Sequence, residues 1–208
     1  MDIKNYIKSR WNQHAERYDK IPAHGVNSEK DKIAVKEALK EILKEKMRVL
    51  DIGCGTGFLS LILAELGCEV VAIDLSENMM EKAKEKAEKF GYNILFKVED
   101  AENLSFEDET FDAVLERHVL WTLPNVERAI KKWTRVLKKR GKLILIESEK
   151  KGNTANHHYD EEIAKKLPFG NGVDLEKFEE IAKSCNLTFT TKKLDCEKIN
   201  LMIICEKL

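Results

Sequence analysis

The sequence predicts one α/β domain over residues 1–208, with a mostly parallel β-sheet covered by helices on both faces. Apolar strand-like runs alternate with helical patterns from residue 48 to residue 146, a strand leads directly into a glycine-rich loop, and the chain ends in two strands joined by a short turn. Strands separated by helices need crossover connections and are therefore parallel, whereas the final hairpin makes one strand antiparallel. A chain of 208 residues is long enough for one such domain and short for two.

Hydrophobic periodicity predicts the elements in order. Residues 2–18 have an apolar stripe at helical spacing, and Ser28 with Asp31 resembles a capping box that opens a helix over residues 29–45. Ser76 and Pro124 suit helix starts, and Gly141 is expected to end the helix before the fifth strand. Further helices are predicted at 58–66, 77–89, 124–138 and 174–184, and strands at 48–52, 69–73, 93–98, 111–115, 142–146, 188–194 and 199–206.

The overall charge argues against a polyanionic partner. The chain has 36 basic and 37 acidic residues, which gives a formal net charge of −1, with 43% hydrophobic and 35% charged residues. This composition is typical of a soluble globular protein. Lysine runs at residues 138–140 and 192–193 have acidic neighbours, so there is no strong nucleic-acid signal.

The cysteines indicate a reducing environment. The five cysteines are scattered, odd in number and without the spacing of zinc or redox motifs, so no metal site is predicted. The segment after Met1 lacks the apolar core of a signal peptide, and no apolar run approaches the length that spans a bilayer. We therefore expect a cytoplasmic protein with no membrane partner.

The most informative segment is residues 49–57, Val-Leu-Asp-Ile-Gly-Cys-Gly-Thr-Gly. A predicted strand runs into glycines at alternate positions and a helix starts at once, which lets a ligand approach the backbone. Phe58 stands where a dinucleotide fingerprint needs its third glycine, which counts against NAD and FAD, and the lysine of a Walker loop is absent. Asp51 would repel a phosphate and favours a cationic ligand. The structural alternative is a tight turn without a ligand.

Acidic residues close the next two strands. Asp74 ends the second strand, where a carboxylate can accept hydrogen bonds from both hydroxyls of a ribose. Its alternative role, capping the next helix, is already filled by Ser76. Asp100, followed by Ala101, closes the third strand, where its carboxylate can accept a hydrogen bond from an adenine amino group.

The loop and the two acidic residues together resemble the class I S-adenosylmethionine-dependent methyltransferases. Residues 51–57 match the family's cofactor motif, residues 74–79 look like its ribose-binding strand end, and residues 106–114 and 135–143 are similar to its later motifs. Lys139-Arg140 stands where a Pro-Gly pair is more usual. The resemblance covers about residues 11–149 and implies a Rossmann-like seven-stranded sheet, mostly parallel with an antiparallel last strand.

The resemblance also implies a cofactor, S-adenosyl-L-methionine, with S-adenosyl-L-homocysteine as its product. Asp51 would hold the cofactor's ammonium group, Asp74 its ribose and Asp100 its adenine, while Leu75 and Met79 would pack on the base. Residues 1–28 would form an N-terminal lid helix and loop, with Tyr18 near the sulfonium. The implied cofactor-binding set is Tyr18, Asp51, Gly53, Cys54, Gly55, Gly57, Asp74, Leu75, Met79, Asp100, Ala101 and Arg117.

The acceptor is expected beyond the carboxyl ends of the fourth and fifth strands. The fourth strand ends in Glu-Arg-His-Val-Leu-Trp at residues 116–121, which lacks the Asn/Asp-Pro-Pro-aromatic motif of adenine and amide methylation and also a Pro-Cys nucleophile. His118 is a candidate general base, and the alternative is that it orients the cofactor's carboxylate. Trp121 either lines an acceptor pocket or packs against the sheet edge.

An irregular insert over residues 150–173 follows the fifth strand. Methyltransferases of the resembled type often bind the acceptor there, so His158 and Tyr159 join His118 as candidate catalytic residues; the alternative is a polar surface loop. The first functional hypothesis is methyl transfer to a small-molecule acceptor. Protein or RNA methylation and a cofactor-binding scaffold without turnover are the alternatives, and the acceptor and the oligomeric state stay open.

Overall fold

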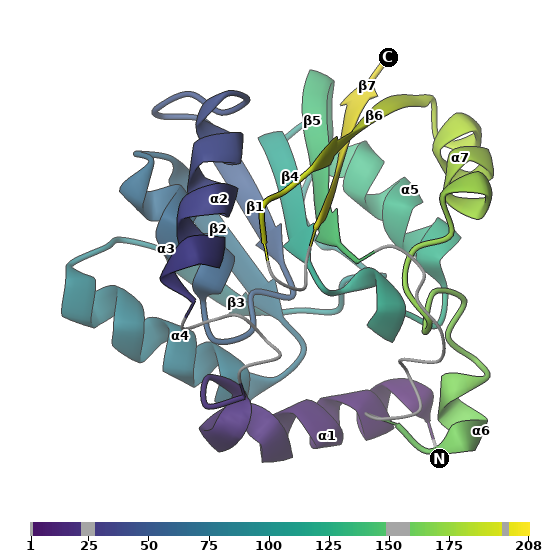
Figure 1. The fold of residues 1–208 in the computed structure, drawn as a ribbon, viewed down its shortest axis with the longest axis horizontal. Coiled ribbons are helices and arrows are strands. Elements are labelled where there is room, and N and C mark those ends of the chain that lie inside the picture. The colour runs from purple at the N-terminus through teal and green to yellow at the C-terminus, as the bar shows by residue number, and fades with distance from the viewer. Residues whose placement is uncertain (1, 22–27, 149–158, 197–199) are drawn as a thin grey trace.

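The computed structural model describes residues 2–21, 28–148, 159–196 and 200–208 of the chain. Within these residues seven strands form one sheet with helices on both faces (Figure 1). The strands are β1 (Arg48–Ile52), β2 (Glu69–Asp74), β3 (Leu95–Val98), β4 (Phe111–Arg117), β5 (Leu137–Glu147), β6 (Leu187–Lys193) and β7 (Leu201–Lys207). The helices are α1 (Ile3–Tyr18), α2 (Glu29–Lys40), α3 (Phe58–Glu65), α4 (Glu77–Phe90), the short 3-10 helix η2 (Leu120–Thr122), α5 (Val126–Val136), α6 (Glu161–Ala164) and α7 (Leu175–Ser184).

The strand order across the sheet is β3-β2-β1-β4-β5-β7-β6. Strands β1 to β5 pair in parallel, and β7 runs antiparallel to both β5 and β6. The chain moves from β1 outward to β3 and returns to β4 on the other side of β1, so the strand order reverses between β1 and β4. Ligands of open α/β sheets bind at such a reversal, outside the carboxyl ends of the strands. The predicted Rossmann-like sheet with an antiparallel last strand is confirmed.

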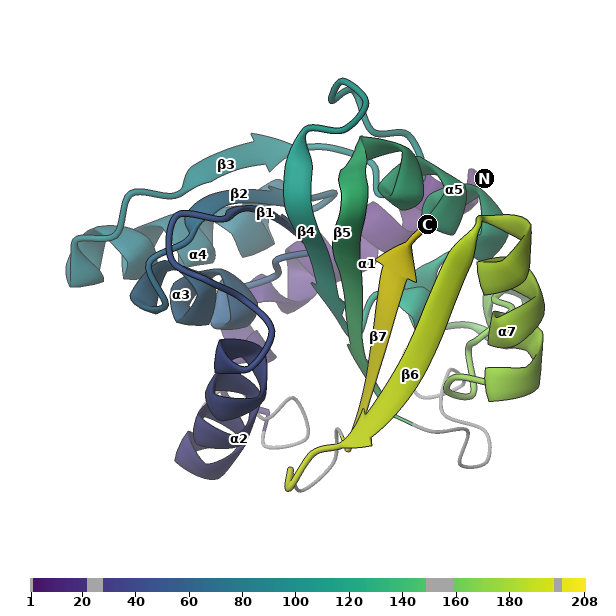
Figure 2. The same ribbon diagram turned by 90° about the horizontal axis from the view of Figure 1, so that it is seen from above.

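Each face of the sheet packs against its own helices (Figure 2). On one face, Leu39 of α2 and Ile62 of α3 belong to the same hydrophobic cluster as Val49 of β1. On the other face, Trp133 of α5 belongs to the same cluster as Leu50 of β1. Consecutive residues of a strand point to opposite faces, so Val49 and Leu50 belong to different layers. Across the described residues, no helix has both the length and the apolar character needed to cross a bilayer.

Helix α1 lies across the carboxyl ends of the parallel strands and on neither face of the sheet (Figure 1). Ile7 and Ala15 are the buried residues of this helix. Polar side chains tie it to α4: Lys8 Nζ lies 2.5 Å from Glu77 Oε1, and Asn12 Oδ1 accepts a hydrogen bond from Ser76 Oγ at 2.6 Å. Its position is the one expected of a lid helix.

Two helices end earlier than the sequence pattern predicts. Helix α2 ends at Lys40 and not near residue 45, and α5 ends at Val136, after which β5 begins at once with Leu137. The predicted start of this strand was residue 142. Leu137 is buried and pairs with Phe111, and a register shift beyond that pair accommodates the residues that precede Lys142. Burial of Leu137 in the sheet therefore overrides helix propensity at this point.

Gly141 has a different role from the predicted one. A Cβ atom on Gly141 would lie 2.8 Å from the carbonyl oxygen of Lys138 and 3.1 Å from that of Asp112, so close backbone approach requires glycine there. The preceding Arg140 has a left-handed φ of 61°. That conformation costs a residue other than glycine about 1–2 kcal/mol. Arg140 occupies the position of the more usual Pro-Gly glycine, and its φ explains that preference.

Candidate functional site

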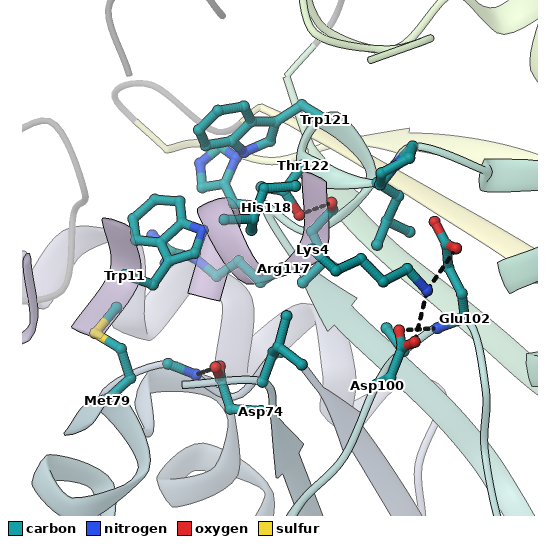
Figure 3. A pocket seen from close by; sticks show the side chains of 18 of the residues that line it. Lys4, Trp11, Asp74, Met79, Asp100, Glu102, Arg117, His118, Trp121 and Thr122 are labelled. Carbon is teal, nitrogen blue, oxygen red and sulfur yellow. Dashed lines mark hydrogen bonds and ion pairs between the residues drawn. The ribbon is translucent and has the colours of Figure 1, made fainter. Parts of the chain in front are cut away.

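A cavity of about 330 Å³ lies between the carboxyl ends of the parallel strands and α1. Its volume is within the range of roughly 300–1,000 Å³ that is typical of small-ligand pockets. In Figure 3, Asp74 and Met79 lie on one side of the cavity, His118 and Trp121 lie on the opposite side, and Lys4 reaches toward Asp100. The predicted residues that line it are Tyr18, Gly53, Gly55, Asp74, Leu75, Met79, Asp100, Ala101, Arg117 and His118.

Two glycines of the loop after β1 shape the cavity floor. Gly53 has a φ of 63°, and a Cβ atom there would lie 2.4 Å from Val119 Cγ2, so glycine lets the loops after β1 and β4 touch. Gly55 has a φ of 53°, and the nearest atom to its missing Cβ is Met79 Cε at 3.8 Å. Because Gly55 also lines the cavity, a side chain there would occupy ligand space.

Asp74 joins the glycine loop to the end of β2. Its Oδ2 accepts a hydrogen bond from Gly55 N, and its Oδ1 accepts one from Ser76 N, both at 2.8 Å. Burial raises the pKa of Asp74 to about 6, although these backbone hydrogen bonds oppose the rise. A carboxylate has about four lone-pair sites, so both oxygens keep capacity for a further donor in the cavity. Asp74 is therefore placed to accept hydroxyl groups.

An ion-pair cluster of Lys4, Asp100 and Glu102 forms a further part of the cavity wall. Lys4 Nζ lies 2.5 Å from Asp100 Oδ2 and 2.8 Å from Glu102 Oε2. Burial works against the charge of Lys4, but the hydrogen bonds to both carboxylates outweigh it and raise the pKa of Lys4. The sequence pattern indicates Asp100 but neither Lys4 nor Glu102. The cluster connects α1 to the segment after β3, which no local pattern reveals.

Asp51, Cys54 and Gly57 do not line the cavity. Asp51 is buried beneath the loop and accepts a hydrogen bond from Ser60 Oγ on α3, whereas its Oδ1 has no hydrogen-bond partner among the described residues. Burial raises the pKa of Asp51 to about 7. Gly57 precedes α3, and Cys54 is a buried free thiol. Contact of Asp51 with an ammonium group stays a prediction.

Arg117 and Tyr18 form a pair beside the loop. The guanidinium of Arg117 lies over the Phe58 ring, 4.2 Å from its centroid, and only 8% of the residue is exposed. Burial raises the pKa of Tyr18. The positive charge of Arg117, which is hydrogen-bonded to the phenol, acts in the opposite direction and lowers it. Both side chains line the cavity, so Arg117 supplies a desolvated cation for an anionic ligand group.

His118 lies in the segment that connects β4 to η2. Its φ of 62° is uncommon for a residue other than glycine, although histidine is among the residues that tolerate it. Its Nδ1 is 3.4 Å from Glu147 Oε2. Glu116 Oε2 accepts from Val119 N at 2.7 Å, and Glu147 Oε1 accepts from Leu120 N at 3.0 Å. Neither glutamate has a role predicted from the sequence. The sequence signal that could have indicated them is an acidic residue near the end of an otherwise apolar strand.

Tyr159 lies behind the cavity wall and not in it. Its hydroxyl accepts a hydrogen bond from Trp11 Nε1 at 3.0 Å, and its ring packs against Trp121 with 5.5 Å between centroids. Burial raises the pKa of Tyr159, which disfavours its ionisation. Trp121 both lines the cavity and packs in this aromatic cluster. His158 lies outside the described residues, so its predicted role stays a prediction.

Comparison with known proteins agrees with this arrangement. A family model described as a methyltransferase domain matches residues 50–145. The chain is 34% identical over 123 residues to a ubiquinone biosynthesis O-methyltransferase of Coxiella burnetii, an alignment that covers 59% of this chain and 51% of that protein. It is 33% identical over 159 residues to a demethylmenaquinone methyltransferase of Desulfitobacterium hafniense, which covers 72% of this chain and 61% of that protein. The chain thus spans only part of the length of these curated relatives.

A solved structure extends the agreement beyond residues 50–145. A SAM-dependent methyltransferase from Methanosarcina mazei superposes with a TM-score of 0.67 and 28% sequence identity, over 82% of this chain and 97% of that one. The matched residues 50–145 are those that build the glycine loop and the Asp74 and Asp100 sides of the cavity. Because sequence and geometry agree at these positions, residues 50–145 form a methyltransferase domain with the fold of the class I S-adenosylmethionine-dependent methyltransferases.

Proposed function

We propose that this protein transfers a methyl group from S-adenosylmethionine to a small-molecule acceptor. The observation that supports the proposal most strongly is that Gly55, Asp74 and Asp100 line one cavity beneath a lid helix. One relative is named a ubiquinone biosynthesis O-methyltransferase and another a demethylmenaquinone methyltransferase, and both names refer to small molecules, which supports the same class of acceptor. The cofactor supplies a methyl group activated by a sulfonium sulfur.

The residues present fit this cofactor. Asp74 accepts the ribose hydroxyls, and Asp100 accepts from the adenine amino group while Leu75 and Met79 pack on the base. Arg117 binds the carboxylate of the methionine end. We assign its ammonium group to Asp51, whose Oδ1 has no hydrogen-bond partner among the described residues. The absence of a side chain at Gly55 leaves space for the ligand against the backbone.

The acceptor occupies the side of the cavity formed after β4 and β5. Trp11, Trp121 and Leu123 give this side aromatic and apolar walls that exclude water. His118 is the titratable side chain that we assign to proton removal from the acceptor. Methyl transfer to a nucleophilic atom then depends mainly on alignment and desolvation, both supplied by the closed lid.

Calorimetry with purified protein tests the cofactor half of the proposal. S-adenosylmethionine and S-adenosylhomocysteine should both bind, and NAD and FAD should give no heat. Incubation with methyl-labelled cofactor and a metabolite extract should then transfer label into the small-molecule fraction. Binding of NAD with no response to either sulfur compound would overturn the proposal, and label found only in macromolecules would overturn its acceptor class.

We also propose that the chain acts in the cytoplasm and that its 208 residues work as one domain. All five cysteines are free thiols, four of them buried, which suits a reducing compartment. Thiol titration of the denatured protein, prepared without reductant and with rapid alkylation, should find five reactive groups per chain. A lower count, from disulfides formed in the cell, would contradict the proposed compartment.

A further inference from the structure

Two carboxyl groups are buried behind His118, at the carboxyl ends of adjacent strands. Glu116 on β4 is 0% exposed and Glu147 on β5 is 2% exposed. Each accepts one backbone N–H from the segment that follows β4, Glu116 from Val119 and Glu147 from Leu120. Glu147 also lines the cavity beside His118, whereas Glu116 lies behind it. The pair therefore holds the segment that carries His118.

The two carboxyl groups lie close enough for one to donate a hydrogen bond to the other. Burial and the neighbouring Glu147 carboxylate raise the pKa of Glu116 well above its ordinary value. Glu116 Oε1 has no hydrogen-bond donor among the described residues, and its side-chain interaction is with Glu147. A proton on Glu116 gives this oxygen a partner, because it then donates to Glu147. Glu147 is then the acceptor of the pair.

Glu147 in turn sets the protonation of the imidazole. Its Oε1 accepts the Leu120 amide, and its Oε2 lies 3.4 Å from His118 Nδ1. An ionised carboxylate is only an acceptor, so it favours a proton on the imidazole nitrogen that faces it. In a neutral imidazole the other nitrogen, Nε2, then has the free lone pair. Arg117 of β4 and Tyr18 of α1 are the other charged or titratable groups near this segment that line the cavity.

We propose that Glu147 is a positioning residue that holds His118 in the Nδ1–H tautomer, so that Nε2 is the basic atom available to the acceptor, with protonated Glu116 as the support of Glu147. This inference rests on the proposed function, in which His118 takes the acceptor's proton. It adds which nitrogen does so and which two side chains decide it. The proton passes from the acceptor to Nε2 and leaves the imidazole carrying one positive charge opposite Glu147.

The test needs no acceptor, because the tautomer is visible in long-range ¹H–¹⁵N NMR spectra of the unliganded protein. His118 is assigned by its loss in His118→Asn, and spectra are recorded at rising pH until its ring is neutral. We expect Nδ1 to carry the proton in the wild type. A neutral His118 protonated on Nε2 would overturn the proposal even if neither glutamate variant folds.

The variant Glu147→Gln should invert the tautomer. Leu120 N–H still needs an acceptor, so the amide oxygen of the new side chain faces Leu120 and its NH₂ group faces His118 Nδ1. The ring nitrogen must then accept, and the proton moves to Nε2. Glu116→Gln is the matched control: it has the hydrogen-bonding pattern of a protonated Glu116 and should leave the tautomer unchanged. Equal spectra for the two variants would contradict the proposal.

A second measurement separates positioning from a structural role. Diethyl pyrocarbonate modifies an accessible imidazole nitrogen that has a free lone pair, and mass spectrometry of the His118 peptide gives the rate. Glu147→Gln should slow modification at His118 at least about fivefold. Glu116→Gln should change the modification rate little, and the melting temperature of either variant should stay close to that of the wild type. Unchanged modification in Glu147→Gln would overturn the positioning role. Cofactor calorimetry on the same samples shows independently whether the proposed function fails.

Discussion

The two sides of the cavity are built in different ways. One side contains Gly55, Asp74 and Asp100 and is built from the ends of β1, β2 and β3, in chain order. The opposite side joins Glu116 of β4 with Glu147 of β5, and its aromatic wall joins Trp11 of α1 with Tyr159. Apart from the ion pair between Lys4 and Asp100, the first side depends on backbone geometry at successive strand ends, whereas the second depends on contacts between distant segments.

The difference also appears in how each side satisfies its buried carboxylates. Asp74 receives two backbone N–H groups from its own neighbourhood, the loop after β1 and the start of α4. Glu147 accepts one backbone N–H, from Leu120, and lies beside a second carboxyl group and an imidazole. We therefore expect substitutions on the first side to act on cofactor affinity, and those on the second to act on lid stability and proton transfer.

The largest effect is expected for Gly55→Val. The branched side chain would fill ligand space and strain a left-handed φ of 53°, so cofactor binding should fall below detection, a loss of more than about 4 kcal/mol. Calorimetry measures it. Gly91→Val is the matched control, because Gly91 has a φ of 71° with nothing within 4 Å of its missing Cβ. Measurable cofactor affinity in Gly55→Val would show that the loop does not contact the ligand.

Asp74→Ala should weaken cofactor binding by roughly 30-fold to 1,000-fold, or about 2–4 kcal/mol, through loss of a charge-assisted bidentate contact. Titration calorimetry with S-adenosylhomocysteine measures the change, and circular dichroism checks that the variant is folded. Glu81→Ala, on the exposed face of α4, is a control that removes a nearby carboxylate outside the cavity. If the two variants bind equally well, the ribose is held elsewhere.

Tyr159→Phe tests the other side of the cavity. It leaves the part-buried Trp11 indole N–H without this acceptor, which should cost about 1–3 kcal/mol of unfolding free energy. Chemical denaturation measures this loss, and cofactor affinity should change less than about threefold because Tyr159 does not line the cavity. Loss of methyl transfer with unchanged stability would instead support the catalytic role predicted for Tyr159.

The smallest effect is a pH dependence with opposite signs for stability and binding. Burial raises the pKa of Asp74 from 3.8 to about 6 and that of Asp51 to about 7. A raised pKa in the folded state means that these two groups add stability as the pH falls through 7 and 6 toward 3.8. Cofactor binding needs ionised Asp74, so affinity should fall by up to about tenfold per pH unit below its pKa. Calorimetry should show a weaker slope in Asp74→Asn, and an equal slope would assign the titration to another group.

Much of the fold was predictable from local rules. Alternation of strands and helices gave the parallel sheet, and the final hairpin gave the reversed β7. Ser28 and Ser76 cap their helices as expected, each accepting the backbone N–H three residues later at 3.2 Å. The predicted helix ends near Lys40 and Val136 were wrong. At the second, burial of Leu137 decides whether the chain continues as a helix or starts a strand.

By itself the sequence determined the glycine loop, Asp74 and Asp100 as parts of one ligand site, because residues at the ends of neighbouring parallel strands must meet at one edge of the sheet. Only the tertiary structure decided that Lys4 pairs with Asp100, that Asp51 lies beneath the loop, and that Glu147 lies beside His118. These contacts join segments whose separation along the chain has no periodic signature. They form because packing buries polar groups that then need partners, a requirement that appears only once the layers are assembled.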